Sequence, residues 1–281
     1  MKRLVPDYQF NGRTVRLRYP AVMGILNLTP DSFSDGGQFM APADALAHAH
    51  RMVKEGAQII DLGGESTRPG SDPVSEQEEL ARVLPIIELL AKEEFVLSLD
   101  TTKPTVALAG LQAGVSILND VSGGNPEMLT HASRFQAGYV LMHAQGAPKD
   151  MQDAPTYEDV VEEVRAFFDQ KFTTIEDLPI PRLWIDPGIG FGKALDHNLA
   201  LMRELDELID PRWGILLGSS RKSWIDHLCN APDPLDRLGG SLCSALAGVA
   251  RGAEIIRVHD VKETVQMLEV AKGLALIEPT E

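Results

Sequence analysis

Residues 95–118 read FVLSLDTTKPTVALAGLQAGVSIL and contain one complete repeat of the pattern that decides the fold. An apolar run at 95–99 leads to Asp100, a helical pattern follows at 103–112, and a second apolar run covers 115–118. Continuous apolar strands joined by a helix are typical of parallel sheets that are buried on both faces. The stretch therefore predicts two parallel strands joined by a helix, with a carboxylate at the end of the first strand.

The same pattern recurs along the rest of the chain. The apolar runs lie near residues 21–28, 58–63, 95–99, 115–118, 138–142, 182–185, 214–217 and 254–258. The helical patterns lie near residues 43–56, 75–93, 103–112, 126–135, 156–176, 197–208, 232–250 and 261–276. Ser75 with Glu78 and Thr156 with Asp159 resemble capping boxes at two helix starts. Units of this kind close naturally into a (β/α)8 TIM barrel, and an open doubly wound sheet is the alternative.

A short β-hairpin is predicted before the barrel. Residues 8–18 alternate in polarity around Asn11-Gly12, a dipeptide that favours a type I′ turn. No stretch of the sequence has the composition of a linker or of a low-complexity segment. We therefore expect residues 1–281 to form a single domain.

Composition and charge exclude several classes of protein. The formal net charge of −15 argues against nucleic acid as a partner, because binding to phosphates needs a basic face. The two cysteines, Cys229 and Cys243, have neither zinc-ligand spacing nor the density of a disulfide scaffold. The first ten residues lack the apolar core of a signal peptide, and no run approaches the ~20 apolar residues of a membrane helix. We expect a cytoplasmic protein with no membrane partner.

Polar residues follow every predicted strand, and a barrel brings those strand ends into one mouth. A single Asp or Asn after a strand usually caps a helix or makes a turn, so only the whole set predicts a site. The set comprises Asn27, Asp61, Asp100, Asn119, His143, Asp186, the segment 219–222 (SSRK), and Arg257 with His259. His143 has no second histidine or carboxylate at metal-ligand spacing, which favours a structural or polar contact.

These side chains divide into two chemical groups. Asp100, Asn119 and Asp186 offer acceptors that suit adjacent N–H groups on a heterocycle. Positive charge that suits phosphate or carboxylate comes from Arg68, Arg221, Lys222, Arg257 and His259. The sequence therefore predicts a substrate with a donor-rich ring and an anionic tail. Asn27 is a candidate oxygen ligand for Mg²⁺, which binds diphosphates and keeps most of its waters.

Three glycine-containing connections lie at the same end of the predicted barrel. Residues 188–193 read GIGFGK, which is neither GxxxxGK[ST] nor GxGxxG, so we interpret them as a loop that lets the backbone approach a ligand. Residues 29–37 and 65–71 are rich in Pro, Gly and Ser. Their length and position predict lids that move over the site.

Two of these connections carry a family resemblance. Residues 23–37, MGILNLTPDSFSDGG, resemble the first signature of dihydropteroate synthases, and residues 63–70, GGESTRPG, resemble the second. The resemblance covers about residues 8–276. It continues through Asp100-Thr101, Asn119-Asp120, Met142-His143, Asp186-Pro187-Gly188, Ser220-Arg221-Lys222 and residues 257–260 (RVHD). Both long signatures keep the form that is ordinary in the family, whereas sulfonamide-insensitive relatives carry altered versions.

The resemblance implies a transferase that joins (7,8-dihydropterin-6-yl)methyl diphosphate to 4-aminobenzoate, giving 7,8-dihydropteroate and diphosphate. It implies catalytic roles for Asp100, Lys222 and Arg257. The matching substrate-binding positions are Asp100, Asn119, Met142, Asp186 and Lys222 for the pterin, Asn27, Arg257 and His259 for the diphosphate with Mg²⁺, and Phe33, Thr67, Arg68, Pro69, Phe191 and Ser223 for the aminobenzoate.

The absence of a Ser-His-Asp or Cys-His motif favours a dissociative, SN1-like displacement over covalent catalysis by the protein. A pterin-dependent methyltransferase of the same barrel family and an inactive pterin-binding protein are the rival hypotheses. Neither rival needs all of the charged residues at the strand ends.

A homodimer is expected, because family members are commonly dimers. The helical stretch 241–253 is also small and apolar around most of its circumference.

Overall fold

The computed structural model describes residues 7–29, 41–66, 71–146, 151 and 154–278. The predicted hairpin is confirmed: β1 (Asp7–Phe10) and β2 (Arg13–Arg16) pair antiparallel, with Tyr8 opposite Val15. The turn residues Asn11 and Gly12 have φ angles of 45° and 76°. Positive φ at both positions is the requirement of a type I′ turn.

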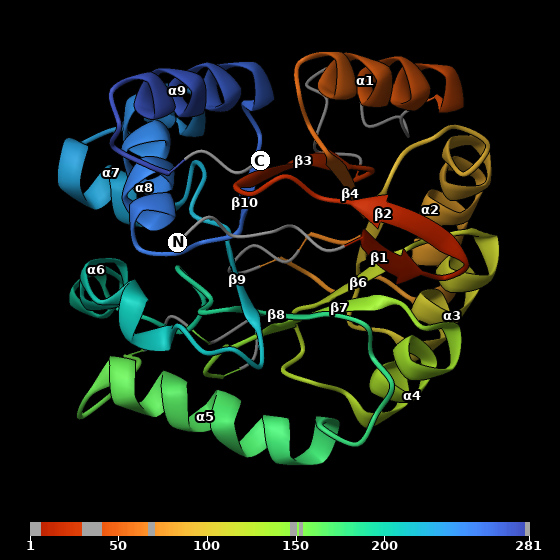
Figure 1. Cartoon of the computed structure of the whole chain (residues 1–281), viewed down its shortest axis with the longest axis horizontal. Helices are drawn as coiled ribbons and strands as arrows, with labels where there is room; N and C mark the ends of the chain where they lie inside the picture. Colours follow the sequence, from red (N-terminus) through yellow and green to blue (C-terminus); the bar gives the residue numbers. More distant parts are fainter. Residues whose placement is uncertain (1–6, 30–40, 67–70, 147–150, 152–153, 279–281) are drawn as a thin grey trace.

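The predicted barrel is also confirmed, and the open sheet is excluded. Eight parallel strands close in the order β10-β3-β4-β5-β6-β7-β8-β9, and helices surround them (Figure 1). The strands are β3 (Ala21–Asn27), β4 (Ile59–Gly63), β5 (Leu97–Asp100), β6 (Ile117–Asp120), β7 (Gly138–Met142), β8 (Leu183–Asp186), β9 (Gly214–Leu217) and β10 (Ile255–Val258).

Except in three places, the helices agree with the sequence prediction to within a few residues. They are α1 (Pro42–Lys54), α2 (Glu76–Leu90), α3 (Pro104–Ala113), α4 (Pro126–Phe135), α5 (Val160–Ile175), α6 (Leu195–Arg203), α7 (Ser223–Cys229), α8 (Leu238–Ala250) and α9 (Val261–Gly273), with short 3-10 turns η2 (Leu205–Leu208) and η3 (Pro234–Arg237). Residues 156–159 precede α5, the predicted helix 197–208 divides into α6 and the 3-10 turn η2, and the region around residues 223–238 differs. The expected helix 232–250 divides into η3 and α8. Helix α7 was not predicted, because it is only 7 residues long and buries little beyond Trp224 and Ile225.

One capping prediction is half right and the other is wrong. The Ser75 hydroxyl accepts the Glu78 amide N–H at 3.2 Å, but the Glu78 carboxylate bonds Arg82 instead of completing a capping box. Helix α5 begins at Val160, and Asp159 is its N-cap, accepting two amide N–H groups. The chain before it stays irregular because the Tyr157 hydroxyl donates to the Gly192 carbonyl at 2.9 Å.

Two apolar cores lie on opposite faces of the strands. The outer core packs strand residues such as Leu99 and Leu118 against the helices. The inner core fills the lumen with one side chain from most strands and joins it to the hairpin; its strand members are Ala21, Met23, Ile59, Ile117, Val140, Trp184, Leu216 and Ile255. Phe10 of the hairpin meets Trp184 edge-on, with ring centroids 6.0 Å apart. The hairpin therefore closes the N-terminal end of the barrel.

Two residues beyond the inner core, most of the side chains that face the lumen are polar. Because side chains alternate between the two faces of a strand, position i+2 points into the lumen again. The pairs are Ile59 with Asp61, Ile117 with Asn119, Val140 with Met142, Trp184 with Asp186, and Ile255 with Arg257. An apolar floor thus lies directly beneath a mostly polar layer, which we call the polar layer.

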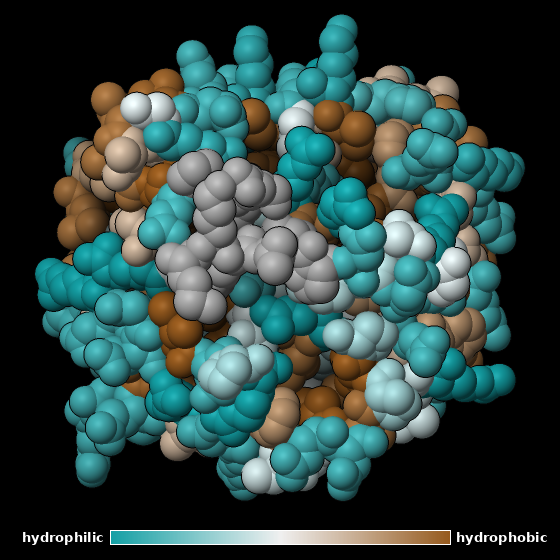
Figure 2. All heavy atoms as spheres, viewed as in Figure 1, coloured by the Kyte–Doolittle hydropathy of each residue, from teal (hydrophilic) through white to brown (hydrophobic). Residues whose placement is uncertain are grey.

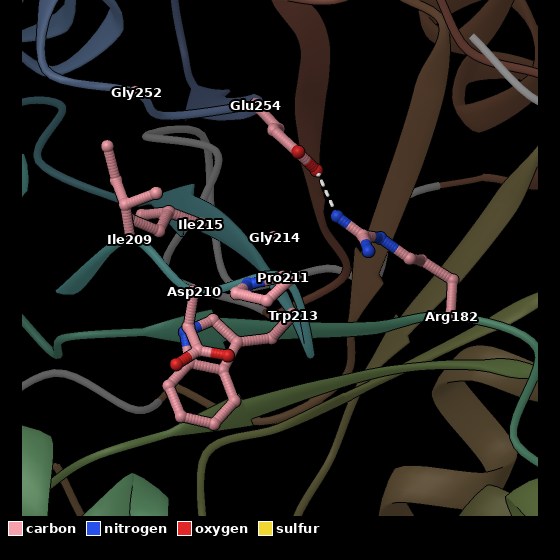
Figure 3. A pocket seen from close by; sticks show the side chains of 9 residues that line it. All are labelled: Arg182, Ile209, Asp210, Pro211, Trp213, Gly214, Ile215, Gly252 and Glu254. Carbon is pink, nitrogen blue, oxygen red and sulfur yellow. Dashed lines mark hydrogen bonds and ion pairs between the residues drawn. The ribbon is translucent and has the colours of Figure 1, made fainter. Parts of the chain in front are cut away.

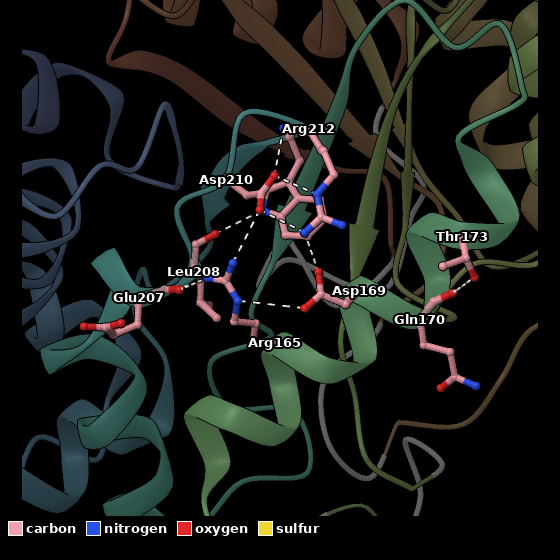
Figure 4. A network of polar contacts seen from close by, with 9 residues as sticks. Arg165, Asp169, Gln170, Thr173, Glu207, Leu208, Asp210 and Arg212 are labelled. Carbon is pink, nitrogen blue, oxygen red and sulfur yellow. Dashed lines mark hydrogen bonds and ion pairs between the residues drawn. The ribbon is translucent and has the colours of Figure 1, made fainter.

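The outer surface carries its own polar contacts. Arg165 and Asp169 of α5 form ion pairs with Asp210 and Arg212, which precede β9 in the chain (Figure 4). Arg212 holds Asp210 at 2.7 Å and lies 4.3 Å from the Trp213 ring centroid. This network attaches α5 to the residues just before β9. None of the helices within the described ranges combines the length and hydropathy that a membrane crossing requires.

Candidate active site

The polar layer places three predicted acceptors at the C-terminal ends of β5, β6 and β8. Asp100 pairs in register with Gly63 on one side and with Asn119 on the other, and Met142 pairs with Asp186. Asp100, Asn119 and Asp186 are each no more than 6% exposed. The barrel therefore brings together acceptors that are far apart in the sequence.

Arg257 lies at the centre of this layer and bonds two carboxylates. Its Nε donates to Asp61 Oδ2 at 2.6 Å, and one terminal nitrogen donates to Asp100 Oδ2 at 2.7 Å. The Asn119 amide also donates to Asp61 Oδ2, at 3.2 Å. Asp61, which is fully buried, therefore orients both Arg257 and Asn119. Sequence reasoning noted Asp61 as a strand end but gave it no role.

Two glycines place no side chain in the polar layer, where a Cβ atom would lie in van der Waals contact with its polar groups. A Cβ atom at Gly218 would lie 3.4 Å from Asp186 Oδ2 and 3.9 Å from the Arg257 side chain. A Cβ atom at Gly63 would lie 3.6 Å from Asn27 Oδ1. Both positions are two residues beyond an inward-facing side chain, so any larger residue there would fill the space between the acceptors. The spacing of these glycines, two residues beyond an inward-facing side chain, could have been found in the sequence alone.

Burial moves the pKa values of Asp100, Asp186 and Lys222 toward neutrality, and neighbouring opposite charges oppose these shifts. Burial raises the pKa of Asp100 to about 7, although the Arg257 guanidinium opposes the shift. Burial also raises the pKa of Asp186, against Lys222 and the Gly188 N–H. Burial lowers the pKa of Lys222 to about 8, while Asp186 acts in the opposite sense. Such shifts are typical of functional sites.

Lys222 and Phe191 meet at the edge of this layer. The Lys222 ammonium lies 4.4 Å from the centroid of the Phe191 ring and donates to the Ile189 carbonyl. Ser223, also predicted as a site residue, is the exposed first residue of α7. The loop 188–192 therefore comes beside the polar layer, and the predicted approach of the backbone at 188–193 to a ligand stays a prediction.

The structure places the residues that were predicted to bind anions in different surroundings. His259 Nδ1 lies 3.2 Å from the Ser220 hydroxyl, and its backbone N–H also donates to that oxygen. Arg221, in contrast, is bonded to Asp260, with its Nε 2.9 Å from Oδ2. The charge of Arg221 is therefore compensated by Asp260, outside the polar layer. Arg257 is also paired, with Asp61 and Asp100, but it lies within the polar layer.

The predicted magnesium ligand Asn27 lies at the end of β3, partly exposed. Its side chain makes no hydrogen bond to any other described residue, so its carbonyl oxygen is available. The described ranges contain no group of three His, Cys, Asp or Glu residues that could hold a metal ion. A single available oxygen suits an ion that is held chiefly by substrate phosphates and water.

Several predictions fall outside the described residues. These are Phe33, Thr67, Arg68 and Pro69, and the greater part of the two predicted lids at 29–37 and 65–71. The described base of the second connection is well anchored: the Glu65 carboxylate accepts the Val74 N–H at 2.8 Å and the Lys103 ammonium at 2.8 Å.

A separate cavity of about 240 Å³ lies at the opposite end of the barrel, where β8, β9 and β10 begin (Figure 3). Its charged walls include Arg182 and Glu254, which pair at 2.8 Å. Glu254 also accepts the Trp184 indole N–H at 3.2 Å. Because the N-terminal face of such barrels serves stability, these charges are best explained as structural.

The chain was compared with known proteins. The family model "Pterin binding enzyme" matches residues 23–259. The dihydropteroate synthase of Escherichia coli strain K12 is 47% identical over 266 residues, which cover 93% of this chain and 94% of that protein.

The chain belongs to the dihydropteroate synthase family.

Solved structures of dihydropteroate synthases match throughout the chain. The Xanthomonas albilineans enzyme with 4-aminobenzoic acid has a TM-score of 0.89 and 42% identity, covering 97% of this chain and 99% of that one. The Burkholderia cenocepacia enzyme complexed with 7,8-dihydropteroate has a TM-score of 0.86 and 40% identity, covering 97% and 98%. The Yersinia pestis enzyme in a sulfonamide complex has a TM-score of 0.87 and 43% identity, covering 98% and 99%. The comparisons give no support to the methyltransferase alternative.

Proposed function

We propose that this protein condenses (7,8-dihydropterin-6-yl)methyl diphosphate with 4-aminobenzoate to give 7,8-dihydropteroate and diphosphate. The observation that carries the proposal is the polar layer, in which the buried acceptors Asp100, Asn119 and Asp186 lie together and Gly63 and Gly218 place no side chain among them. A flat ring with several N–H donors would donate hydrogen bonds to these buried acceptors. The ligands of the related solved structures, 4-aminobenzoate and dihydropteroate, support the same reaction.

Each charged residue has a role that its position supports. Asp186 and Asp100 would accept ring N–H groups, and Lys222 would donate to a ring acceptor. Arg257 and His259 would bind the diphosphate, and Phe191 with Ser223 would contact the aminobenzoate. Met142 pairs with Asp186 and would pack against the pterin. The contacts of Phe33, Thr67, Arg68 and Pro69 with the aminobenzoate remain proposals from the family resemblance.

The reaction would proceed by a dissociative, SN1-like displacement. The C–O bond to diphosphate breaks first, and its electron pair leaves with the diphosphate as Arg257 and His259 balance the developing charge. The dihydropterin ring stabilises the methylene cation, helped by the negative charges of Asp100 and Asp186. The arylamine nitrogen then forms the new C–N bond and releases a proton. A weakly basic amine needs no strong general base once the cation has formed.

We propose Mg²⁺ as the cofactor, with Asn27 as its ligand from the protein. When bound, the ion would supply further positive charge to the leaving diphosphate. The other contributions to the reaction would come from the side chains described above.

The direct test is to mix the purified protein with the pterin diphosphate, 4-aminobenzoate and Mg²⁺ and to follow diphosphate release. We expect release that depends on 4-aminobenzoate and is competed by a sulfonamide. A protein that binds the pterin but never releases diphosphate would contradict the proposal. A methyltransferase would instead transfer a methyl group from a methylated pterin.

The mechanism has a separate test in positional isotope exchange. Bridging ¹⁸O in the pterin diphosphate should scramble to non-bridging positions before 4-aminobenzoate is added. The bound diphosphate must be free to rotate for this result. Absence of scrambling in an enzyme shown to allow that rotation would indicate concerted displacement.

We further propose a single-domain, cytoplasmic homodimer. Exposed apolar side chains on α7, on η3 and after α9 support an interface: Leu228, Leu235 and Leu274 are 53%, 66% and 66% exposed. Hydrophobic atoms gather at the upper left of Figure 2, where Figure 1 places α7 to α9. The free, exposed thiols of Cys229 and Cys243 suit a reducing compartment. A monomeric mass in light scattering at micromolar concentration would contradict the dimer.

A further inference from the structure

Lys193 is a buried lysine to which the proposed mechanism gives no role. It is 2% exposed and follows the glycine loop 188–192. Its ammonium lies 2.9 Å from His143 Nδ1, 3.0 Å from the Phe191 carbonyl and 3.4 Å from the His143 carbonyl. Among the described residues no carboxylate forms an ion pair with it. A buried ammonium with only neutral hydrogen-bond acceptors is costly, and burial lowers the pKa of Lys193 to about 7, although the charge of Asp186 opposes the shift. The presence of a lysine at this position therefore calls for an explanation.

The glycine loop is built around this ammonium. Gly188, Gly190 and Gly192 all have positive φ, at 68°, 82° and 60°. A Cβ atom would lie 1.8 Å from the His143 carbonyl oxygen at Gly188, and 2.1 Å from the Gln145 carbonyl oxygen at Gly192. The loop therefore lies directly against the chain that leaves β7, and side chains are excluded from both contacts.

Two lysines hold this loop on either side of Phe191. Lys222 bonds the Ile189 carbonyl, and Lys193 bonds the Phe191 carbonyl. Lys193 also joins the loop to His143 at the end of β7. Asn198 accepts the Gly190 N–H at 2.7 Å and Tyr157 donates to the Gly192 carbonyl at 2.9 Å, so the neighbouring backbone has its own anchors. Release of the Phe191 carbonyl would loosen the one residue between them, whose ring lies against Lys222.

We infer that Lys193 is a positioning residue for 4-aminobenzoate: its ammonium clamps the Phe191 carbonyl to His143 and so fixes the Phe191 ring at the edge of the polar layer. This inference rests on the proposed function and adds a residue to it. The clamp requires His143 Nδ1 to accept a hydrogen bond, so the proton of the neutral ring lies on Nε2. Burial and the charge of Lys193 lower the pKa of His143 to about 3, which keeps the ring neutral.

The test separates the two substrates. Lys193→Met keeps an unbranched stem that ends at the ε position but removes the donor and the charge, and Lys193→Gln restores a neutral donor. For Lys193→Met we expect the KM for 4-aminobenzoate to rise about tenfold with a smaller change in kcat. We expect the Kd for a simple pterin to stay within about twofold of the wild-type value, since no ring acceptor is lost. Lys193→Gln should recover part of the KM, and Lys262→Met, at an exposed lysine, is the matched control.

An unchanged KM for 4-aminobenzoate, or an equal loss of pterin binding, would overturn the inference. If the wild-type protein itself shows no release of diphosphate that depends on 4-aminobenzoate, the proposed function has failed instead. A measurement on the wild-type protein covers the case in which the variants do not fold. The ¹⁵N shifts of His143 should report the Nε2–H tautomer, and a proton on Nδ1 would refute the clamp.

Discussion

Lys103 forms a buried ion cluster, and its loss should lower the free energy of unfolding. Its ammonium lies 2.8 Å from Glu65 Oε2 and 2.6 Å from Glu79 Oε2. The exposed fractions of the side chains are 16% for Lys103, 11% for Glu65 and 0% for Glu79. The other Glu79 oxygen, Oε1, is buried without a hydrogen-bond partner in the described part of the chain. Lys103 is thus the ionic partner of Glu79, and it ties α2 to the ends of β4 and β5.

Lys103→Met leaves the Glu79 carboxylate buried and unpaired. Breaking a buried ion pair by removal of one partner costs about 3–5 kcal/mol. We expect the free energy of unfolding at neutral pH to fall by that amount. The deficit should shrink as the pH is lowered, because the stranded carboxylate can then take up a proton. The measurement is equilibrium unfolding in guanidinium, followed by circular dichroism and by tryptophan fluorescence.

Two further variants make the measurement specific. Lys272→Met breaks a pair with Glu269, whose side chain is 65% exposed, and should change stability by no more than ~0.5 kcal/mol. Lys103→Met combined with Glu79→Gln removes the stranded charge and should be more stable than Lys103→Met alone. If Lys103→Met loses less than about 1 kcal/mol, or if the two substitutions are additive, the reasoning about buried charge is refuted.

Three other predictions concern the polar layer. Asp186→Asn should weaken binding of a simple pterin by roughly 1.5–3 kcal/mol without unfolding the protein, and calorimetry that finds unchanged affinity in both Asp186→Asn and Asp100→Asn would disprove the assignment. Because burial raises the pKa of Asp100 to about 7 and lowers that of Lys222 to about 8, pterin affinity should rise as the pH increases through the first value and fall above the second. Asp100→Asn should lose the acidic limb of that profile, and a limb that persists would point to another group. Removal of Mg²⁺ with a chelator should suppress turnover but leave the affinity for a pterin without diphosphate unchanged, which calorimetry with and without the chelator can check.

The sequence predicted the barrel because each strand is a continuous apolar run with a nearly uniform signal. Helix α7 escaped prediction because its seven residues carry too little periodicity to distinguish them from a loop. The start of α5 was misplaced because Thr156 with Asp159 and Asp159 with Glu162 both have the spacing of a capping box, and the structure uses Asp159 as the N-cap.

The site was predictable to a similar extent. Residues at the strand ends were found from their position alone, since a barrel gathers them at one mouth. The roles of Asp61 and Lys193 were missed, because both act through bonds to other side chains or to backbone. The pairing of Arg221 with Asp260 depends on the geometry of two separate connections, so its charge was counted toward the substrate.

The alternation between floor and polar layer has a consequence for how strictly the strands must be aligned. Leu99 faces the helices and Asp100 faces the lumen, so a slip of one residue in β5 would exchange them. Such a slip would place a carboxylate among the leucines of the outer core and an apolar side chain where the ring is to be bound. A register error in β5 would therefore also remove a side chain that recognises the ligand. A chain that binds the ring has, by that fact, its strands in register.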